Sequence, residues 1–155
     1  MTKIIGVIGA GSCNHHLKEV AFTVGREIAK NKAILVCGGL GGVMEAASKG
    51  AKSVGGTTVG ILPGFNPNEA NSYIDIPIVT GLSHGRNLII VRTSQTLIAI
   101  GGQYGTLSEI AFALKLNKPI VGLFTWEISS EIILTQDPID AVKRAMDLIN
   151  EDGQI

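Results

Sequence analysis

The sequence predicts one α/β domain over residues 1–155, a doubly wound, Rossmann-like fold with a mostly parallel sheet. Apolar strands and amphipathic helices alternate from residue 3 to residue 150 without a repeat, a linker or a shift in composition. The strands lack polar alternation, as parallel strands do when helices cover both faces of their sheet. Glycine accounts for 20 of the 155 residues and gathers where strands end. Doubly wound sheets bind ligands at these strand ends, so the glycines mark the predicted site.

The first part of the chain contains three short apolar runs, each closed by glycine or proline, which predict strands over residues 3–8, 33–37 and 57–62. The segment 17–31 predicts a helix because its apolar residues recur at helical spacing: Leu17, Val20, Ala21, Val24 and Ile28. A shorter helix is expected over residues 43–53. This alternating order is typical of right-handed crossover units in a parallel sheet.

The middle of the chain is less regular. Residues 65–72 are polar and predict a surface loop. Residues 73–79 predict a short strand near an edge of the sheet or in a bend, because Pro77 cannot donate a hydrogen bond to a neighbouring strand. A helix is expected within residues 81–94, and it leads to the central strand.

The last part begins with an entirely apolar strand over residues 96–100, which stops at a glycine pair. A helix then opens at Gly105-Thr106, with apolar residues at helical spacing: Leu107, Ile110, Ala111 and Leu114. A further strand is expected over residues 119–124. The final helix is expected to begin at Asp137-Pro138, an N-cap followed by proline at the first helical position. Its predicted buried residues are Ile139, Val142, Met146 and Ile149.

Composition excludes several classes of function. Thirteen basic residues balance thirteen acidic ones, so a broad cationic face for nucleic acid or for a membrane surface is not expected. No apolar run reaches the roughly 18 residues of a membrane span. Cys13 and Cys37 are too few for a disulfide scaffold and are expected to be reduced thiols. We therefore expect a cytoplasmic protein.

The turn after the strand 96–100 predicts a phosphate site. Glycines let a backbone approach a ligand closely, and the free N–H groups at a helix start attract anions. Glu109 lies about one turn inside the helix, so its carboxylate is expected to face the bound group. The residues expected to hold the phosphate are Gly101, Gly102, Gly105 and Thr106.

Two further glycine clusters are expected at the same edge of the sheet. One contains Gly9, Gly11 and Ser12, and the other contains Gly38, Gly39, Gly41 and Gly42. The first cluster is not a dinucleotide fingerprint, because Asn14 stands where its third glycine belongs. The second strand also ends without an acid for a ribose hydroxyl. Three clusters at one edge favour a nucleotide-like ligand with a phosphate, although a plain strand-to-helix turn is the alternative for each.

Arg86 is the expected partner of the anion. It stands before an apolar helix in a chain with few charges, and its planar guanidinium suits a phosphate or a carboxylate. The alternative is an exposed arginine without a ligand. A metal site is not expected, because the adjacent His15 and His16 cannot share one helix face.

Arg86 and the segment Gly101–Glu109, with the sequence GGQYGTLSE, resemble the arginine and the PGGxGTxxE signature of the LOG superfamily, also described as lysine-decarboxylase-like. Its characterised enzymes are nucleoside 5′-monophosphate phosphoribohydrolases. The resemblance implies that the glycines and Thr106 hold a 5′-phosphate and that Arg86 and Glu109 are catalytic. A carboxylate there would stabilise the positive charge that builds on the ribose as the N-glycosidic bond breaks.

The chain is similar to a branch of short proteins near the molybdenum cofactor carrier proteins and, more distantly, the Rossmann domain of DprA. Three positions depart from the hydrolases: Ile100 in place of proline, Gly85 in place of glutamate and Asn87 in place of lysine. These departures favour binding over turnover.

Three hypotheses follow. The first is a phosphoribohydrolase, and the second is a carrier that holds molybdenum cofactor, a pterin phosphate, as cargo without chemistry. The third is a DNA-processing module, which the zero net charge disfavours. No cofactor is expected to be required, and the family implies a homodimer or homotetramer.

Overall fold

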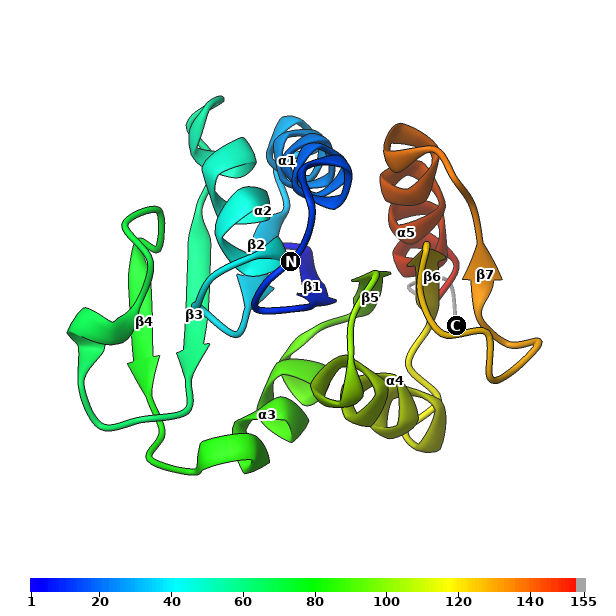
Figure 1. Cartoon of the computed structure of the whole chain (residues 1–155). Coiled ribbons are helices and arrows are strands. Elements are labelled where there is room, and N and C mark those ends of the chain that lie inside the picture. Colours follow the sequence, from blue (N-terminus) through cyan, green and yellow to red (C-terminus); the bar gives the residue numbers. More distant parts are fainter. Residues whose placement is uncertain (153–155) are drawn as a thin grey trace.

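The computed structural model describes residues 1–152, and it has one seven-stranded sheet in the order β4-β3-β2-β1-β5-β6-β7 (Figure 1). All six strand pairs are parallel, which confirms the predicted α/β class and goes beyond the expectation of a mostly parallel sheet. The strands are β1 (Ile4–Gly9), β2 (Ile34–Cys37), β3 (Thr58–Leu62), β4 (Ile76–Val79), β5 (Thr96–Ile100), β6 (Ile120–Leu123) and β7 (Ile133–Leu134).

Helices cover both faces of the sheet (Figure 1). Helices α1 (His15–Lys30), α2 (Val43–Lys52) and α5 (Pro138–Asp152) lie on one face, and α3 (Arg86–Thr93) and α4 (Tyr104–Lys115) lie on the other. Two short 3₁₀ helices, Pro67–Glu69 and Ser83–Gly85, interrupt the connections on either side of β4. Among the described residues, no helix combines the length and the apolar character that crossing a membrane requires.

Each face of the sheet has its own apolar core, which explains the absence of polar alternation in the strands. Ile5 and Val7 of β1 pack toward α1, α2 and α5, while Ile8 packs toward α3 and α4. The same division separates Ile98 from Leu97 in β5. Both faces of these central strands are therefore buried.

The direction of winding reverses at β1, which pairs with β2 on one side and with β5 on the other. The carboxyl ends of β1 and β5 are in register, with Gly9 opposite Ile100. The glycine turns after these strands therefore lie at the topological switch point, where this class of sheet forms its ligand crevice.

Helix α4 differs from its prediction. It begins at Tyr104, one residue before the expected Gly105, and of the predicted buried residues only Ile110 is fully buried. The other buried residues of this helix are Thr106, Glu109 and Ala113. Thr106 and Glu109 in the first two turns of α4 face a cavity with a mixed polar and apolar lining, so polar side chains take inward positions there.

At the two ends of the sheet, the prediction for one strand is confirmed and the other strand was not predicted. Strand β4 is an edge strand, as Pro77 predicted. Strand β7 was not predicted, because two residues within a polar stretch carry no periodic signal.

Helix α5 begins at Pro138, and the Asp137 carboxylate accepts a hydrogen bond from Ile139 N at 2.9 Å, as expected of an N-cap. Its buried residues are Ala141, Val142, Ala145 and Ile149, and Met146 is half-buried against the core. Ile139 was predicted wrongly, because its side chain is exposed.

Candidate functional site

A cavity of about 250 Å³ lies at the switch point, between the end of β1, the start of α2 and the helices α3 and α4. It brings together residues far apart in the sequence. Seven of the predicted site residues line it: Gly9, Gly11, Gly38, Arg86, Gly105, Thr106 and Glu109. Arg86 and Glu109 therefore share one cavity with Gly105 and Thr106, two of the four residues predicted to hold the phosphate.

The second glycine turn contacts backbone. Gly42 has φ +60°, and a Cβ there would clash with the carbonyl oxygen of Ala10. Gly41 lies against the carbonyl of Gly11, and Gly39, with φ +77°, packs on Gly60. Gly39, Gly41 and Gly42 do not line the cavity, and neither does the exposed Ser12. Val43 N also donates a hydrogen bond to Ala10 O at 3.0 Å. The second glycine turn therefore supports the turn that contains Gly9 and Gly11.

Gly101 and Gly102 shape the turn between β5 and α4. Their φ angles are +55° and +108°, a region that other residues rarely adopt. A Cβ on Gly102 would overlap the side chain of Thr106, and one on Gly101 would overlap that of Leu17. Neither glycine lines the cavity. They allow the chain to enter α4 with Thr106 turned inward.

The first turn of α4 offers unused donors. Its N-cap residue, Gln103, makes no side-chain capping hydrogen bond. The N–H groups of Tyr104, Gly105 and Thr106 have no acceptor within the helix, as at any helix start. Helix α1 differs, because Asn14 caps it by accepting from Leu17 N at 2.9 Å. The start of α4 is therefore free to bind an anion.

Arg86 lines the cavity and has one buried donor without a partner. The residue is 9% exposed, and its Nε has no hydrogen-bond partner. Burial lowers the pKa of the guanidinium, but the neighbouring Glu109 and Cys37 oppose this effect, and an arginine stays charged at neutral pH. Gly38 makes room for the group, since a Cβ there would lie 2.8 Å from Nη2.

Asn87 holds Arg86 and was missed by sequence analysis, which treated it only as a replaced lysine. Its amide oxygen accepts a hydrogen bond from Arg86 Nη1, and its Nδ2 donates to Ser108 Oγ at 3.1 Å. Ser108 Oγ in turn donates to Gly105 O at 2.7 Å. This chain connects the guanidinium on α3 to the first turn of α4. Its one sequence signal is the position of Asn87 directly after the arginine.

Glu109 lies in the same cavity and is 6% exposed. Burial raises its pKa to about 8, and the positive charge of Arg86 opposes that rise only in part. No oxygen of Glu109 comes within 4 Å of the guanidinium nitrogens, so the described residues contain no ion pair between them. At neutral pH the carboxyl is mainly protonated and can donate a hydrogen bond.

The rest of the lining is mixed. Three further residues that were not predicted line the cavity: Leu40, Met44 and Gln103. His84 also lines it, and its side chain is exposed. Cys37 is buried beside the site, and its Sγ accepts from Gly39 N at 3.4 Å. Within residues 1–152, no group of three or more His, Cys, Asp or Glu side chains is arranged to hold a metal ion.

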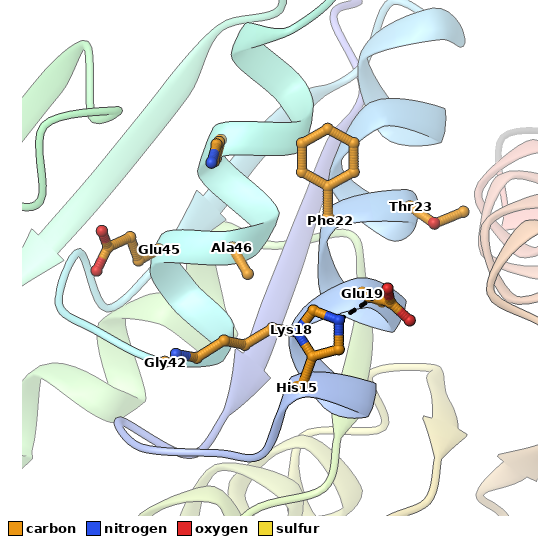
Figure 2. Close-up of a pocket in the computed structure, with 9 residues that line it drawn as sticks. His15, Lys18, Glu19, Phe22, Thr23, Gly42, Glu45 and Ala46 are labelled. Atoms are coloured by element: carbon orange, nitrogen blue, oxygen red, sulfur yellow. Dashed lines mark ion pairs between the residues drawn. The ribbon is translucent and has the colours of Figure 1, made fainter.

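A larger hollow, of about 680 Å³, lies between the outer faces of α1 and α2 (Figure 2). Lys18 extends across it toward Gly42, while Glu45 points away from α1. His15 is paired with Glu19 at 3.0 Å. The charged side chains here are exposed and balance one another, so this hollow lacks the buried, unsatisfied group that marks the smaller cavity.

Comparison with known proteins identifies the family. The model of the SLOG cluster4 family matches residues 2–149, nearly the whole chain. The chain belongs to the SLOG cluster4 family. This confirms the resemblance to LOG-like proteins that Arg86 and the segment 101–109 predicted. An uncharacterised protein of Archaeoglobus fulgidus is 47% identical over 138 residues, which cover 89% of this chain and 91% of that protein.

Two solved structures are similar over almost their whole length. The molybdenum cofactor binding protein of Rippkaea orientalis is 36% identical, with a TM-score of 0.91 over 96% of this chain and 98% of the other. The Moco carrier protein of Chlamydomonas reinhardtii is also 36% identical, with a TM-score of 0.88 over 97% and 99%. DNA processing protein A of Helicobacter pylori is 18% identical with a TM-score of 0.71, a likeness of fold alone.

The LOG signature aligns with this chain one residue later than the sequence analysis expected. The signature has one residue between its glycine pair and its Gly-Thr, whereas this chain has two, Gln103 and Tyr104. Aligned backwards from Glu109 without a gap, Gly101 takes the place of the proline and Gln103 that of the second glycine. The substitution assigned to Ile100 therefore belongs to Gly101.

Proposed function

We propose that the protein binds a phosphate-bearing pterin, the molybdenum cofactor, as cargo in the cavity between β1, α3 and α4. The observation that carries this proposal is the buried guanidinium of Arg86, whose Nε has no partner, in the cavity that the uncapped start of α4 also lines. A buried cation and a set of free N–H groups together favour an anionic ligand. No resident cofactor is required for this role.

The phosphate is proposed to lie at the start of α4. Gly105 and Thr106 line the cavity there, and Gly101 and Gly102 give the turn its shape. Arg86 offers the planar fork of donors that suits a phosphate. In the wall formed by the first glycine turn, Gly11 has only the end of the Met44 side chain near its missing Cβ, at 3.9 Å, so a ligand can approach the backbone there.

The choice of a pterin is supported by the similar structures, which are of molybdenum cofactor binding and carrier proteins. A cavity of about 250 Å³ is near the lower end of the size range for ligand sites. It suits a phosphate and the part of the ligand next to it, with the remainder at the open rim. A nucleoside monophosphate has the same arrangement of phosphate and planar ring.

A phosphoribohydrolase is the second candidate, because Arg86 and Glu109 line one cavity. Hydrolysis builds positive charge on the ribose, which an ionised carboxylate stabilises. Burial raises the pKa of Glu109 to about 8, so its carboxyl is mainly neutral at pH 7. A raised pKa is also typical of the general acid in glycoside hydrolysis, so Glu109 is compatible with both candidates. The carrier function is favoured because the similar structures at 36% identity are of molybdenum cofactor binding and carrier proteins.

We further propose a cytoplasmic homodimer or homotetramer that does not bind nucleic acid. The edge strand β4 supports assembly, because Ile76, Ile78 and Val79 all expose apolar side chains. The zero net charge disfavours nucleic acid. Neither cysteine forms a disulfide within residues 1–152, which is compatible with a reducing compartment.

Expression in a host that makes molybdenum cofactor tests the carrier function. The purified protein is denatured and oxidised with iodine, which converts bound molybdopterin into a fluorescent pterin that is quantified. We expect pterin with the wild type and about a tenfold loss with Arg86→Ala, because the phosphate loses a charged donor. Arg92→Ala is the matched control, since Arg92 is an exposed arginine on the same helix. Equal pterin in both variants, or none in the wild type, contradicts the proposal.

The second candidate is tested by release of free base and ribose 5-phosphate from a panel of nucleoside monophosphates. The carrier function predicts no steady release with the wild type. Steady release that disappears in Glu109→Gln would establish the hydrolase instead.

A further inference from the structure

Two sides of the cavity at the switch point differ chemically. Helices α3 and α4 supply polar side chains, among them Arg86, Asn87 and Glu109. The turn after β2 and the start of α2 supply an apolar wall of two side chains, Leu40 and Met44. Ligand sites commonly combine an apolar surface with a few placed polar groups. A phosphate uses only the polar side, so the apolar wall is available for the rest of the ligand.

Met44 is the more buried part of the apolar wall and lies beside the arginine. The residue is 8% exposed. A Cβ on Gly38 would stand 2.7 Å from Met44 Sδ and 2.8 Å from Arg86 Nη2, so Gly38 makes room for both groups. The Cε of Met44 lies 3.9 Å from the position that a Cβ on Gly11 would take. The thioether therefore extends from the neighbourhood of the guanidinium to the first glycine turn.

The connection between β3 and β4 holds Leu40, the half-buried part of the wall. Asn71 N donates to Gly39 O at 2.9 Å, and Asn71 Nδ2 donates to Leu40 O at 2.8 Å. The amide oxygen of Asn71 accepts from Tyr73 N at 3.0 Å, which fixes the orientation of the amide. The backbone of Leu40 is therefore held in place, although it lies in a turn whose glycines would otherwise leave it free.

We propose that Met44 and Leu40 form the subsite for the planar ring of the ligand whose phosphate lies at the start of α4, and that Asn71 positions Leu40. The inference rests on the proposed function and adds the contact for the ring. Methionine suits a flat heteroaromatic ring, because its flexible and polarisable thioether makes favourable contacts with aromatic systems. Leucine adds apolar surface that the ring removes from water. The class of ligand is a planar heteroaromatic ring linked to a phosphate, which includes pterins and purines.

The test compares two ligands of the full-length protein by isothermal titration calorimetry. One is the phosphorylated oxidised pterin derived from molybdopterin, and the other is ribose 5-phosphate, which carries a phosphate without a planar ring. The wild type is expected to bind the pterin at least about fivefold more tightly, because the ring contact adds to the phosphate contact. Met44→Gln is expected to lose most of this preference and to keep its affinity for ribose 5-phosphate. Met44→Leu, which conserves volume and apolar character, is expected to retain both.

Matched variants separate the ring contact from general damage to the fold. Met146→Gln is the control for Met44→Gln, since Met146 is a half-buried methionine on α5 that does not line the cavity. Asn71→Ala is expected to weaken pterin binding about threefold and to leave ribose 5-phosphate binding unchanged, because Leu40 loses its support. Asn68→Ala is expected to change neither affinity, since Asn68 is an exposed asparagine of the same loop.

The outcomes distinguish the ring subsite from the phosphate site. The subsite is wrong and the phosphate site stands if the wild type binds both ligands equally, or if Met44→Gln keeps the full preference for the pterin. An equal loss of both ligands in Met44→Gln also overturns the subsite, because the methionine would then act on the phosphate. A preference that Asn71→Ala leaves unchanged overturns the positioning of Leu40 by that residue. If neither ligand binds to the wild type, the subsite and the proposed function are both overturned.

Discussion

The guanidinium of Arg86 occupies the space that a side chain at Gly38 would take, because a Cβ there would stand 2.8 Å from Nη2. The glycine at the end of β2 thus admits the arginine of α3, and the two residues come from opposite halves of the chain. Gly38→Ala is expected to displace Arg86 and to weaken binding of ribose 5-phosphate about tenfold. Isothermal titration calorimetry measures this change, and Gly85→Ala is the control, since Gly85 does not line the cavity and its Cβ would meet only Leu82, at 3.6 Å. Unchanged binding in Gly38→Ala would show that the position of Arg86 does not matter.

Asn87→Ala tests the chain of hydrogen bonds between Arg86 and α4. The variant leaves Nη1 as well as Nε of Arg86 without a partner. We expect a loss of about tenfold in ribose 5-phosphate affinity, the usual effect of removing a charge-assisted hydrogen bond. Ser108→Ala, which removes only the link from Asn87 to Gly105, is expected to have a smaller effect. The account fails here if Ser108→Ala weakens binding more than Asn87→Ala does.

Glu109 predicts a pH dependence of stability. Its pKa is about 8 in the folded protein, against 4.5 for an unperturbed glutamate, so the folded protein binds more protons than the unfolded chain between these values. Stability from this group is complete below about pH 4.5 and falls as the pH rises toward 8, on the order of a few kcal/mol. Urea denaturation across this range measures the slope, and Glu109→Gln is expected to remove most of it. A wild-type slope that the variant retains would contradict the assignment.

Binding is predicted to follow the same carboxyl. Above about pH 8 an ionised Glu109 would repel a phosphate in the shared cavity, so the affinity for ribose 5-phosphate is expected to fall. Glu109→Gln keeps a hydrogen-bond donor without the charge and should retain its affinity at pH 9. The comparison is made by calorimetry at pH 7 and 9. Identical losses in both proteins would exclude this role.

Gly42→Ala tests the support of the first glycine turn by the second. Its φ of +60° and the carbonyl of Ala10 both oppose a side chain. We expect a loss of about 2 kcal/mol or more in the free energy of unfolding. Gly55→Ala is the control, because Gly55 has φ +75° with open space around it and should lose only the strain of the backbone. Equal losses would mean that the contact with Ala10 adds nothing.

Local patterns predicted the sheet and the main site residues. Alternating apolar runs and helical stripes indicated six of the seven strands, and Pro77 indicated the edge position of β4. Arg86 and Glu109 were recognised because each lies in or near the start of a helix that follows a glycine-containing turn, and because both match the LOG signature. These signals lie within short segments, so they survive without knowledge of tertiary structure.

The remaining features depend on contacts across the chain. Asn87 joins Arg86 to Ser108 on another helix, and no local pattern encodes that meeting. A glycine that approaches a backbone looks in sequence like one that approaches a ligand, which is why Gly42 could not be separated from Gly38. The apolar residues of α4 were predicted to face an apolar core, but the start of this helix faces the cavity, where Thr106 and Glu109 point inward.

The most direct test of the central claim is a comparison of two oxidised pterins derived from molybdopterin, one with its phosphate and one after phosphatase treatment. Their affinities for the wild-type protein are measured by isothermal titration calorimetry. If the phosphate lies against Arg86 at the start of α4, the phosphorylated pterin binds at least about tenfold more tightly, and Arg86→Ala removes that difference. Equal affinities of the wild type for the two pterins would contradict the phosphate site and with it the proposed carrier function.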